Sequence, residues 1–335
     1  MEKIYWTSTD VRKLYRLKDK ISPQTLLNAE EKGIIPKAKR VARGKVEVRQ
    51  WHIEQIPFIG AEFGFLTPPK DQLRICIYAP KGGVLKTTFG FNLARILALN
   101  GIKTLVIGLD AIQASITNYT LPKKSIESLE QLKDETNGLY HYFFEKQTIK
   151  SIIQKTSLPT LDVIAETPEL SHVELKLKMA TRREYFFKEK LIPNLKEYQV
   201  ILFDNNPGWS QLVENSLTAS NIVITPMGCD IESYKAIDKN LSILFSFQEE
   251  AKIDWTHFFQ IPTLIEKNKL SQQIYAAYVN NYPHSLISFP IRRSIKGQEA
   301  RAFNQCVLEH EPNSELSQDY YDAITEIWNR ITNKG

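Results

Sequence analysis

A short loop rich in lysine and glycine carries the clearest chemical pattern in this sequence. Residues 80–88 read Pro-Lys-Gly-Gly-Val-Leu-Lys-Thr-Thr and stand between a β-branched apolar run, residues 73–79, and an apolar helical pattern. A polyphosphate needs a concave row of backbone N–H groups, glycines that let the backbone approach, and a helix N-terminus that points at it. The order of strand, loop and helix is therefore that of a phosphate-binding P-loop.

The residues of this loop are suited to holding ATP with Mg²⁺. We expect Gly82 and Gly83 to admit the phosphates and Lys86 to reach the outer ones. The hydroxyl of Thr87 is placed to hold the Mg²⁺ that bridges the phosphates. The predicted nucleotide-binding residues of the loop are Lys81, Gly82, Gly83, Val84, Leu85, Lys86, Thr87 and Thr88.

The loop departs from the general G-x-x-x-x-G-K-[ST] pattern, because Pro80 and Leu85 stand at its two glycine positions. The run Lys-Gly-Gly-Val-x-Lys-Thr-Thr resembles the deviant P-loop of the ParA and MinD family of DNA-partition and positioning ATPases. The resemblance implies that Lys81 is catalytic and reaches the nucleotide of a partner chain across a dimer. Leucine at position 85 removes the freedom that glycine has to take a positive φ, so we expect slow hydrolysis.

Two aspartates follow strand-like runs further along the chain. Residues 103–109 are predicted as a strand that ends at Asp110, and the apolar run 198–203 ends at Asp204. In a parallel sheet such ends share the edge where ligands bind. We expect Asp110 to orient the attacking water, with helix N-capping as the alternative. Asp204, together with Thr87, is expected to hold the Mg²⁺ shell through water.

Both aspartates lie in stretches that resemble the same family, with departures. Residues 108–113 correspond to an Asp-x-Asp-Pro-Gln signature, but Gly108 replaces the first aspartate and one extra residue is present. Residues 204–208 look like a Walker B element with its switch turn. Residues 212–226 resemble the family again, and by that resemblance Pro226 belongs to the nucleotide site.

The N-terminal part of the chain is a basic module. Residues 1–70 hold 14 of the 43 Lys and Arg but only 8 of the 38 Asp and Glu. The rest of the chain holds 29 Lys and Arg and 30 Asp and Glu, so it is close to neutral. Helices over 8–17 and 22–33 and a basic hairpin over 37–49 are predicted, and a helix resumes at Trp51. This order resembles the winged helix-turn-helix of MerR-type regulators.

That resemblance implies DNA binding, against the alternative of a hairpin that is merely solvated. The second helix would enter the major groove and the wing would contact phosphates. A second basic cluster near the C-terminus resembles a region that touches DNA without reading sequence, with ordinary surface cations as the alternative. The predicted DNA contacts are Gln24, Thr25, Asn28, Lys37, Lys39, Arg40, Arg43 and Lys45 in the module, and Arg292, Arg293 and Lys296 in the second cluster.

We therefore predict a winged helix-turn-helix domain over 1–66, a proline-containing linker over 67–72 and an ATPase body over 73–335. The body is expected to be an α/β domain with a doubly wound, mostly parallel sheet. Neither an N-terminal apolar h-region nor a membrane-spanning run is evident, which predicts a cytoplasmic, nucleoid-associated protein. The three cysteines are scattered, which argues against a disulfide framework or a metal cluster.

The resemblance implies a DNA-partition ATPase for a plasmid, phage or chromosome. Such a protein dimerises on ATP, binds DNA, is released after slow hydrolysis stimulated by a ParB-like partner, and can also autoregulate its operon. One alternative is a nucleotide-gated transcriptional repressor with little turnover, which Leu85 and Gly108 favour. Another is a MinD-like positioning ATPase. That class needs a basic amphipathic C-terminal helix, whereas Asp319, Asp322 and Glu326 make this one acidic, so no membrane partner is expected.

Overall fold

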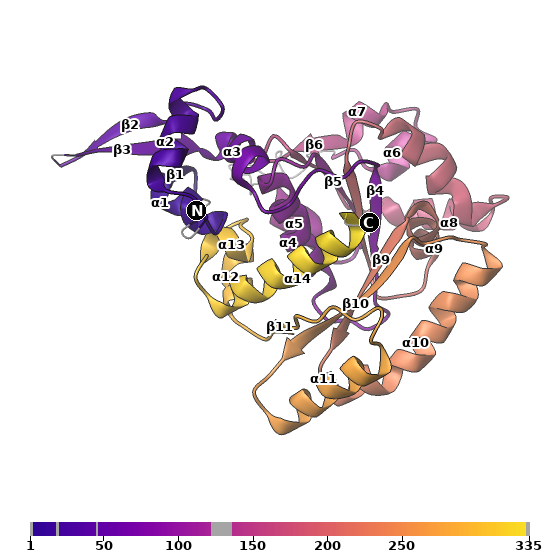
Figure 1. Cartoon of the computed structure of the whole chain (residues 1–335). Helices are drawn as coiled ribbons and strands as arrows, with labels where there is room; N and C mark the ends of the chain where they lie inside the picture. Colours follow the sequence, from indigo (N-terminus) through magenta and orange to yellow (C-terminus); the bar gives the residue numbers. More distant parts are fainter. Residues whose placement is uncertain (1–2, 18–19, 45, 122–135, 333–335) are drawn as a thin grey trace.

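The computed structural model describes residues 3–17, 20–44, 46–121 and 136–332. A large α/β body carries a smaller N-terminal module at one side, and the hairpin of this module projects away from the body (Figure 1). The body is built on an eight-stranded sheet and the module on a three-stranded one.

The sheet of the body is almost entirely parallel. Its strand order is β11-β10-β9-β4-β8-β5-β7-β6, and β6 pairs antiparallel with β7. The central strands are near-continuous apolar runs because helices cover both of their faces. The strands are β4 (Leu73–Ile77), β5 (Thr104–Leu109), β6 (Ile153–Lys155), β7 (Leu161–Ile164), β8 (Val200–Asn205), β9 (Ile222–Gly228), β10 (His257–Ile265) and β11 (Ile291–Arg292).

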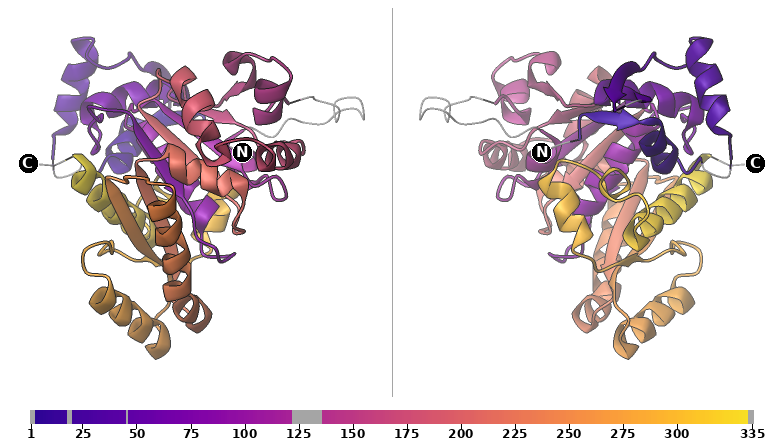
Figure 2. Two further views of the ribbon diagram at one scale, coloured as in Figure 1. Left: turned by 90° about the vertical axis from the view of Figure 1, so that its right-hand side faces the viewer. Right: turned by 90° about the vertical axis from the view of Figure 1, so that its left-hand side faces the viewer.

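Helices pack on both faces of this sheet (Figure 2). Ile75 and Ile77 of β4 join a core with α4 and α14, whereas Cys76 between them packs with α9 and α10 on the other face. The predicted doubly wound architecture is confirmed. The helical elements of the body are α4 (Lys86–Leu99), α5 (Ser115–Thr120), α6 (Leu139–Phe144), α7 (Ile149–Ile152), α8 (Leu170–Lys178), η3 (Arg183–Tyr185), η4 (Phe187–Leu191), η5 (Ile192–Asn194), α9 (Gln211–Ala219), α10 (Ile231–Glu250), α11 (Lys269–Asn281), α12 (Lys296–Ala302), α13 (Val307–His310) and α14 (Glu315–Thr332).

The N-terminal module consists of two helices, a hairpin and a third helix. Thr7 caps the first helix through a capping box with Asp10, and Ser22 caps the second by accepting a hydrogen bond from the backbone N–H of Thr25. Gly33 ends the second helix with a φ of +70°. The elements are β1 (Tyr5–Thr7), α1 (Ser8–Leu14), α2 (Pro23–Glu31), β2 (Lys39–Arg43), β3 (Val46–His52), η1 (Ile53–Gln55) and α3 (Ile56–Phe63).

Two predicted boundaries in this module are wrong. The first helix ends at Leu14 instead of residue 17, because Arg16 takes a left-handed conformation with a φ of 54°. The helix predicted from Trp51 begins only at Ile53, since Trp51 belongs to β3 and pairs with Trp6 of β1. The Trp51 indole N–H also donates to the Pro36 carbonyl oxygen at 2.7 Å, which ties the strand to the exit of α2.

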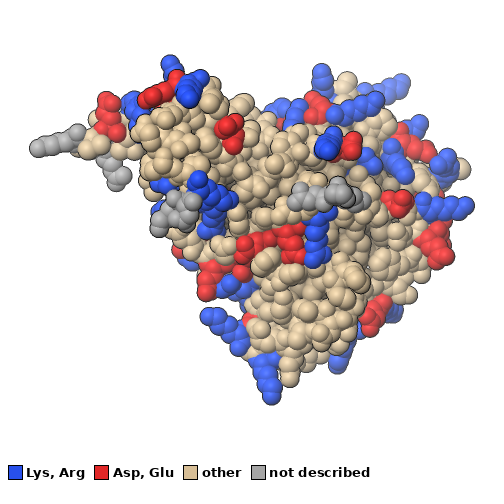
Figure 3. All heavy atoms as spheres, viewed as in Figure 1, with Lys and Arg blue, Asp and Glu red and all other residues tan. Residues whose placement is uncertain are grey.

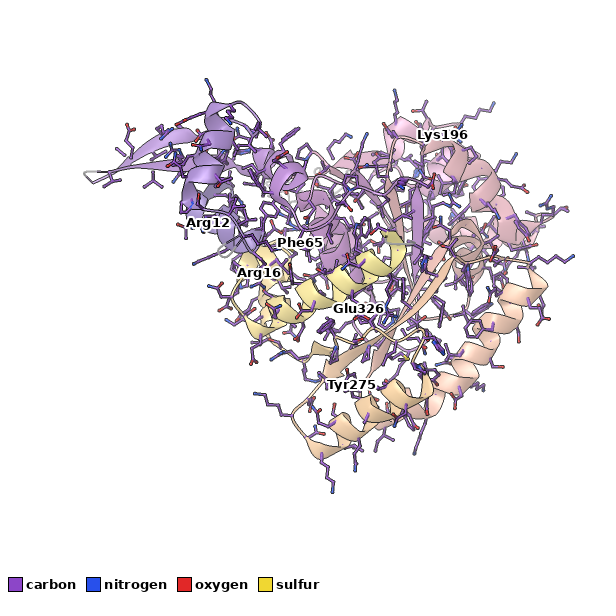
Figure 4. All side chains as sticks on the ribbon, viewed as in Figure 1. Arg12, Arg16, Phe65, Lys196, Tyr275 and Glu326 are labelled. Carbon is purple, nitrogen blue, oxygen red and sulfur yellow. The ribbon has the colours of Figure 1, made fainter. Side chains whose placement is uncertain are left out.

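The segment that follows α3 is held against the body by hydrogen bonds. The Asn100 Oδ1 atom, at the end of α4, accepts the backbone N–H groups of Phe65 at 2.7 Å and Leu66 at 3.1 Å. The Trp328 indole of α14 donates to the Thr67 carbonyl oxygen at 2.8 Å. Phe65 lies beside α14 in Figure 4, where its ring centroid is 4.6 Å from that of Tyr321.

The module also contacts the far end of the helix that starts at the P-loop. The buried Tyr15 hydroxyl lies 2.7 Å from the Leu99 carbonyl oxygen and 2.9 Å from the Ile56 carbonyl oxygen. A Cβ atom at Gly60 of α3 would lie only 1.8 Å from the Leu99 carbonyl oxygen. Because α3 and α4 meet at backbone distance, the module is mounted directly on α4.

We predict that Gly60→Ala destabilises the whole chain, because the added Cβ must push α3 away from α4. Overpacking of this kind costs about 1–3 kcal/mol or more. The matched control is Gly297→Ala, another helical glycine, whose Cβ would meet no atom nearer than 3.6 Å. Urea denaturation followed by circular dichroism would compare the two variants. Equal midpoints for Gly60→Ala and the control would show that the contact between α3 and α4 is not tight.

Candidate nucleotide-binding site

The P-loop joins the carboxyl end of β4 to the N-terminus of α4, as predicted. Gly83 has a φ of +78°, and a Cβ at Gly82 or Gly83 would meet no atom within 4 Å. Both glycines line a cavity of about 180 Å³ together with Lys86 and Thr87 of the first helical turn. The open space above the glycines is what the backbone N–H groups of a P-loop need to reach phosphate.

Leu85 adopts a glycine-like conformation, contrary to the expectation from its residue type. Its φ and ψ are 67° and 25°, and it occupies the N-cap position of α4. The expectation that leucine excludes a positive φ here is therefore wrong. A left-handed residue other than glycine costs about 1–2 kcal/mol. The side chain is partly buried and packs against the core beneath α4, which offsets part of this strain.

Lys86 is almost fully buried, with 7% of its surface exposed, and its ammonium donates to the Lys81 carbonyl oxygen at 2.8 Å. Burial lowers the pKa of Lys86 to about 8, although the negative charges of Asp204 and Asp110 oppose the shift. A desolvated ammonium gains strongly from a new anionic partner, because low dielectric strengthens the attraction. Its position in the loop thus fits a phosphate ligand.

Asp204 lies at the tip of β8, between β4 and β5, with Ile77 and Gly108 opposite it in the two ladders. It is fully buried, and neither carboxylate oxygen has a hydrogen-bond partner of good geometry among the described residues. Burial raises the pKa of Asp204 to about 8 and the charge of Glu166 adds to the rise, whereas the nearby Thr87 hydroxyl opposes it. A buried polar group without a partner is costly, so its retention points to a ligand.

These residues fit a hydrated Mg²⁺ ion. The unpartnered carboxylate of Asp204 and the neighbouring Thr87 hydroxyl are hard oxygen donors of the kind Mg²⁺ prefers. In the described part of the chain, no group of three or more His, Cys, Asp or Glu side chains is arranged to hold a metal alone. The ion would therefore need nucleotide phosphates and water to complete its shell, as is usual for Mg²⁺.

Asp110 lines the same cavity, with 7% of its surface exposed. Its Oδ1 atom accepts the backbone N–H groups of Ile112 at 3.3 Å and Gln113 at 3.2 Å, so it closes the turn that follows β5. It does not cap α5, because the N-cap residue there is Ala114. The Asp110 side chain therefore caps the turn after β5 and also lines the same cavity as Thr87.

Lys81 points away from its own P-loop cavity. Its ammonium donates to the Asp230 Oδ1 atom at 2.8 Å and to the Ser233 hydroxyl at 3.0 Å, at the N-terminus of α10. It lines a neighbouring cavity of about 510 Å³ that also contains Gly82 and Glu232. In this arrangement, Lys81 is directed to the outer surface between the P-loop and α10.

The predicted and observed sites differ at a few residues. Pro226 lies inside β9, opposite Ile261, and is not among the residues that line the cavities around the P-loop. Arg301 was not predicted from the sequence as a site residue. Arg301 nevertheless lines the Thr87 cavity and donates a hydrogen bond to the Thr88 hydroxyl at 2.6 Å. Glu166 was not predicted as a site residue either. Its only sequence signal is its place just after the strand-like run 161–164.

The predicted DNA-reading side chains of the module are exposed. Gln24, Thr25 and Asn28 lie on the outer side of α2, opposite buried Leu26 and Ala29. Lys37 precedes β2, and Lys39, Arg40 and Arg43 lie on it. Figure 3 shows Lys and Arg interspersed with Asp and Glu over this face of the molecule. Lys37, Lys39 and Arg40 are exposed, Arg40 lies 3.8 Å from Glu30, Arg43 ends β2, and Lys45 lies outside the described residues.

The second basic cluster is paired with acidic residues of the same chain. The Arg292 guanidinium makes two hydrogen bonds to Asp319, at 2.6 and 2.8 Å, and also pairs with Glu315. These acidic partners raise the pKa of Arg292, Asp319 most strongly. Arg293 lies 2.5 Å from Glu266. Lys296 pairs with Glu311 at 2.8 Å. Because acidic side chains offset these positive charges, the ion pairs do not favour non-specific DNA binding by this cluster. Such binding stays a prediction.

The fold and the loop define a P-loop nucleotide-binding protein. The family model described as an AAA domain matches residues 73–256, more than half of the chain, so the chain belongs to this family. Among curated relatives, the sporulation initiation inhibitor protein Soj of Bacillus subtilis is 24% identical over 254 residues, which cover 76% of this chain and 97% of Soj. ParA of Myxococcus xanthus is 23% identical over 78% of this chain and 89% of that protein. The predicted resemblance to the ParA family is confirmed.

Solved structures show the same fold. A plasmid partition protein of Borrelia burgdorferi bound to AMPPNP is 24% identical, covers 78% of this chain and 99% of its own, and gives a TM-score of 0.61. The Cyanothece McdA–ATP complex is 17% identical, covers 78% of this chain and 96% of its own, and gives 0.64. Both similarities extend over most of the chain and almost all of the compared proteins.

We predict that Leu85→Gly raises ATP turnover. Glycine removes the strain of the left-handed residue, worth about 1–2 kcal/mol, and leaves more room beside the phosphates. Lys252→Gly is the matched control, because Lys252 also has a positive φ, 49°, but follows α10 away from the P-loop. Phosphate release under saturating ATP would measure turnover. An unchanged or lower turnover in Leu85→Gly, at equal ATP affinity, would show that leucine does not limit the reaction.

Proposed function

We propose that the chain is an ATP-dependent DNA-partition ATPase, acting on a plasmid, phage or chromosome, with weak Mg²⁺-dependent hydrolysis. The observation that carries this proposal is the convergence of the P-loop, Asp110 and the loop after Asp204 on one cavity at the carboxyl edge of β4, β5 and β8. The names of similar proteins support it, since they include a chromosome partitioning protein and a plasmid partition protein.

The residues that line the cavity, together with Asp204 buried beneath it, would each serve one part of the reaction. Lys86 and the backbone of the P-loop hold the outer phosphates, while Thr87 and Asp204 hold the hydrated metal. Bound Mg²⁺ would supply positive charge against the phosphate oxygens. Asp110, held by its contacts to the turn 111–113, orients the attacking water. Arg301 and Tyr119 close the side of the cavity beyond Thr88.

Two copies of the chain would close around ATP, with Lys81 serving the partner's nucleotide. The direction of the Lys81 ammonium, outward to Asp230, supports this role, because a lysine acting within its own chain would point into the Thr87 cavity. Asp230 holds Lys81 in the single chain, so formation of the dimer exchanges this ion pair for contacts with phosphate. The exchange makes dimerisation depend on nucleotide.

The N-terminal module would bind DNA through α2 and the wing. Because the module is mounted on α4 through Tyr15 and Gly60, an ATP dimer would hold two modules at a fixed separation. Fixed separation favours a DNA site with two half-sites over a single one. We assign release from DNA to hydrolysis stimulated by a ParB-like partner, and autoregulation of the operon and association with the nucleoid follow from the same DNA binding.

A nucleotide-gated repressor with little turnover is the second candidate. The strained Leu85 favours it, because a leucine lines the cavity where related loops have glycine, while Lys86 and Thr87 are kept. A MinD-like membrane role is less compatible with the structure. Tyr320, Ile324 and Ile327 place the apolar face of α14 in the core, and no helix in the described ranges is long and apolar enough to cross a membrane.

We predict different losses for the two lysines of the loop. Lys86→Ala should abolish ATP binding, because its buried ammonium is the phosphate ligand. Lys81→Ala should leave ATP binding of the monomer unchanged but prevent ATP-dependent dimerisation. Lys150→Ala, an exposed lysine of α7, is the control. Calorimetric titration and light scattering would give the two readouts. Equal loss of ATP binding in both variants would contradict the role of Lys81 in trans.

A further inference from the structure

A buried glutamate occupies the space beside Gly108 at the metal edge of the site. Glu166 follows the end of β7 by two residues, and 7% of its surface is exposed. A Cβ atom built at Gly108 would lie 2.4 Å from the Glu166 Cγ atom and 2.5 Å from its Cδ atom. The carboxyl group of Glu166 therefore fills the place that a side chain at position 108 would take.

The strand order brings this carboxylate next to Asp204. β5 lies between β7 and β8, with Ile107 opposite Ile164 on one side and Gly108 opposite Asp204 on the other. Glu166 reaches over Gly108 from β7, so three neighbouring strands carry the two carboxylates and the glycine between them. The glycine is required, because any larger residue would displace the glutamate.

The two oxygens of Glu166 are in different situations. Oε2 accepts the Thr117 backbone N–H at 3.0 Å and the Thr117 hydroxyl at 2.6 Å, and the Glu166 N–H in turn donates to that hydroxyl at 3.0 Å. These bonds fasten α5, and with it the turn that begins at Asp110, to the end of β7. Oε1 is also buried but has no hydrogen-bond partner of good geometry among the described residues.

Loop anchoring alone does not explain a charged group here. Burial raises the pKa of Glu166, and the charge of Asp110 adds to the rise, although the bonds from Thr117 and the nearby Ile116 backbone N–H oppose it. An uncharged acceptor such as glutamine could make the Thr117 bonds without this cost. A buried acidic group with an unused oxygen, beside the fully buried Asp204, thus points to a positive or hydrogen-donating ligand.

We propose that Glu166 is a positioning residue of the metal site, whose Oε1 atom accepts a hydrogen bond from a water of the Mg²⁺ shell. The inference rests on the proposed function and extends it to a residue outside the P-loop, Asp110 and Asp204. Glu166 acts in two ways. Its Oε2 atom fixes the Asp110 turn through Thr117, and its negative charge and free oxygen orient the hydrated cation beside Asp204. Gly108 is the residue that makes room for both.

The test separates the charge of Glu166 from its hydrogen bonds to Thr117. Glu166→Gln keeps an oxygen for Thr117 but puts an NH₂ group, which cannot accept a hydrogen bond, in place of Oε1. Glu197→Gln, in an exposed surface pair with Lys103, is the matched control. Thermal unfolding would be followed with saturating ADP in EDTA and with increasing MgCl₂, which gives the apparent Mg²⁺ affinity without any turnover.

We expect Glu166→Gln to melt within about 2 °C of the unmodified chain in EDTA with ADP and to need about tenfold more Mg²⁺ for half of the metal-dependent stabilisation, as outer-shell changes typically do. ATP turnover should fall at fixed Mg²⁺ and recover when Mg²⁺ is raised. An unchanged Mg²⁺ affinity in Glu166→Gln would overturn the proposal and would leave anchoring of the Asp110 turn as the role of Glu166. A loss of ADP binding by Glu166→Gln in EDTA would also overturn the proposal, because it would show that Glu166 serves only to hold the structure of the site. If the unmodified chain itself shows no Mg²⁺ response, the proposed function fails instead.

Discussion

Asp204 is a fully buried carboxylate with no hydrogen-bond partner of good geometry among the described residues, and the arrangement of the site depends on how its charge is accommodated. Lys86 is buried nearby, and its pKa is lowered by burial just as that of Asp204 is raised. Each group would be costly alone in this low-dielectric setting. A magnesium nucleotide brings both a cation for Asp204 and an anion for Lys86, so the site is most stable when it is filled.

The parallel sheet is what places these groups at one point. β4, β8 and β5 are neighbours in the sheet although β8 comes last of the three in the sequence, and their carboxyl ends carry the P-loop, Asp204 and Asp110. The same helix that presents Lys86 and Thr87 runs through the core to Leu99, where the N-terminal module contacts its end. One rigid element therefore connects the phosphate site to the module, and motion of α4 on nucleotide binding would move the module with it.

Much of the site could be predicted from the sequence because its signals are local. The apolar runs before residues 80, 110 and 204 mark buried parallel strands, and the residues just after such strands reach the ligand edge. Glu166 could not be predicted in this way, because its place depends on the long-range pairing of β7 with β5 and on the absence of a side chain at Gly108. The positive φ of Leu85 contradicts the usual preference of leucine, and only the packing beneath α4 shows how it is tolerated. Tertiary contacts likewise set the acidic partners of Arg292, which are Asp319 and Glu315.

The rate of phosphate release measures most directly whether the chain hydrolyses ATP in a cycle that is coupled to DNA. The measurement uses the full chain with Mg²⁺ and ATP, with and without DNA, against Asp110→Ala as the background. We predict slow release above that background that changes when DNA is added. Release no faster than that of Asp110→Ala under both conditions, despite ATP binding, would contradict the cycle and identify a nucleotide-gated DNA-binding protein instead.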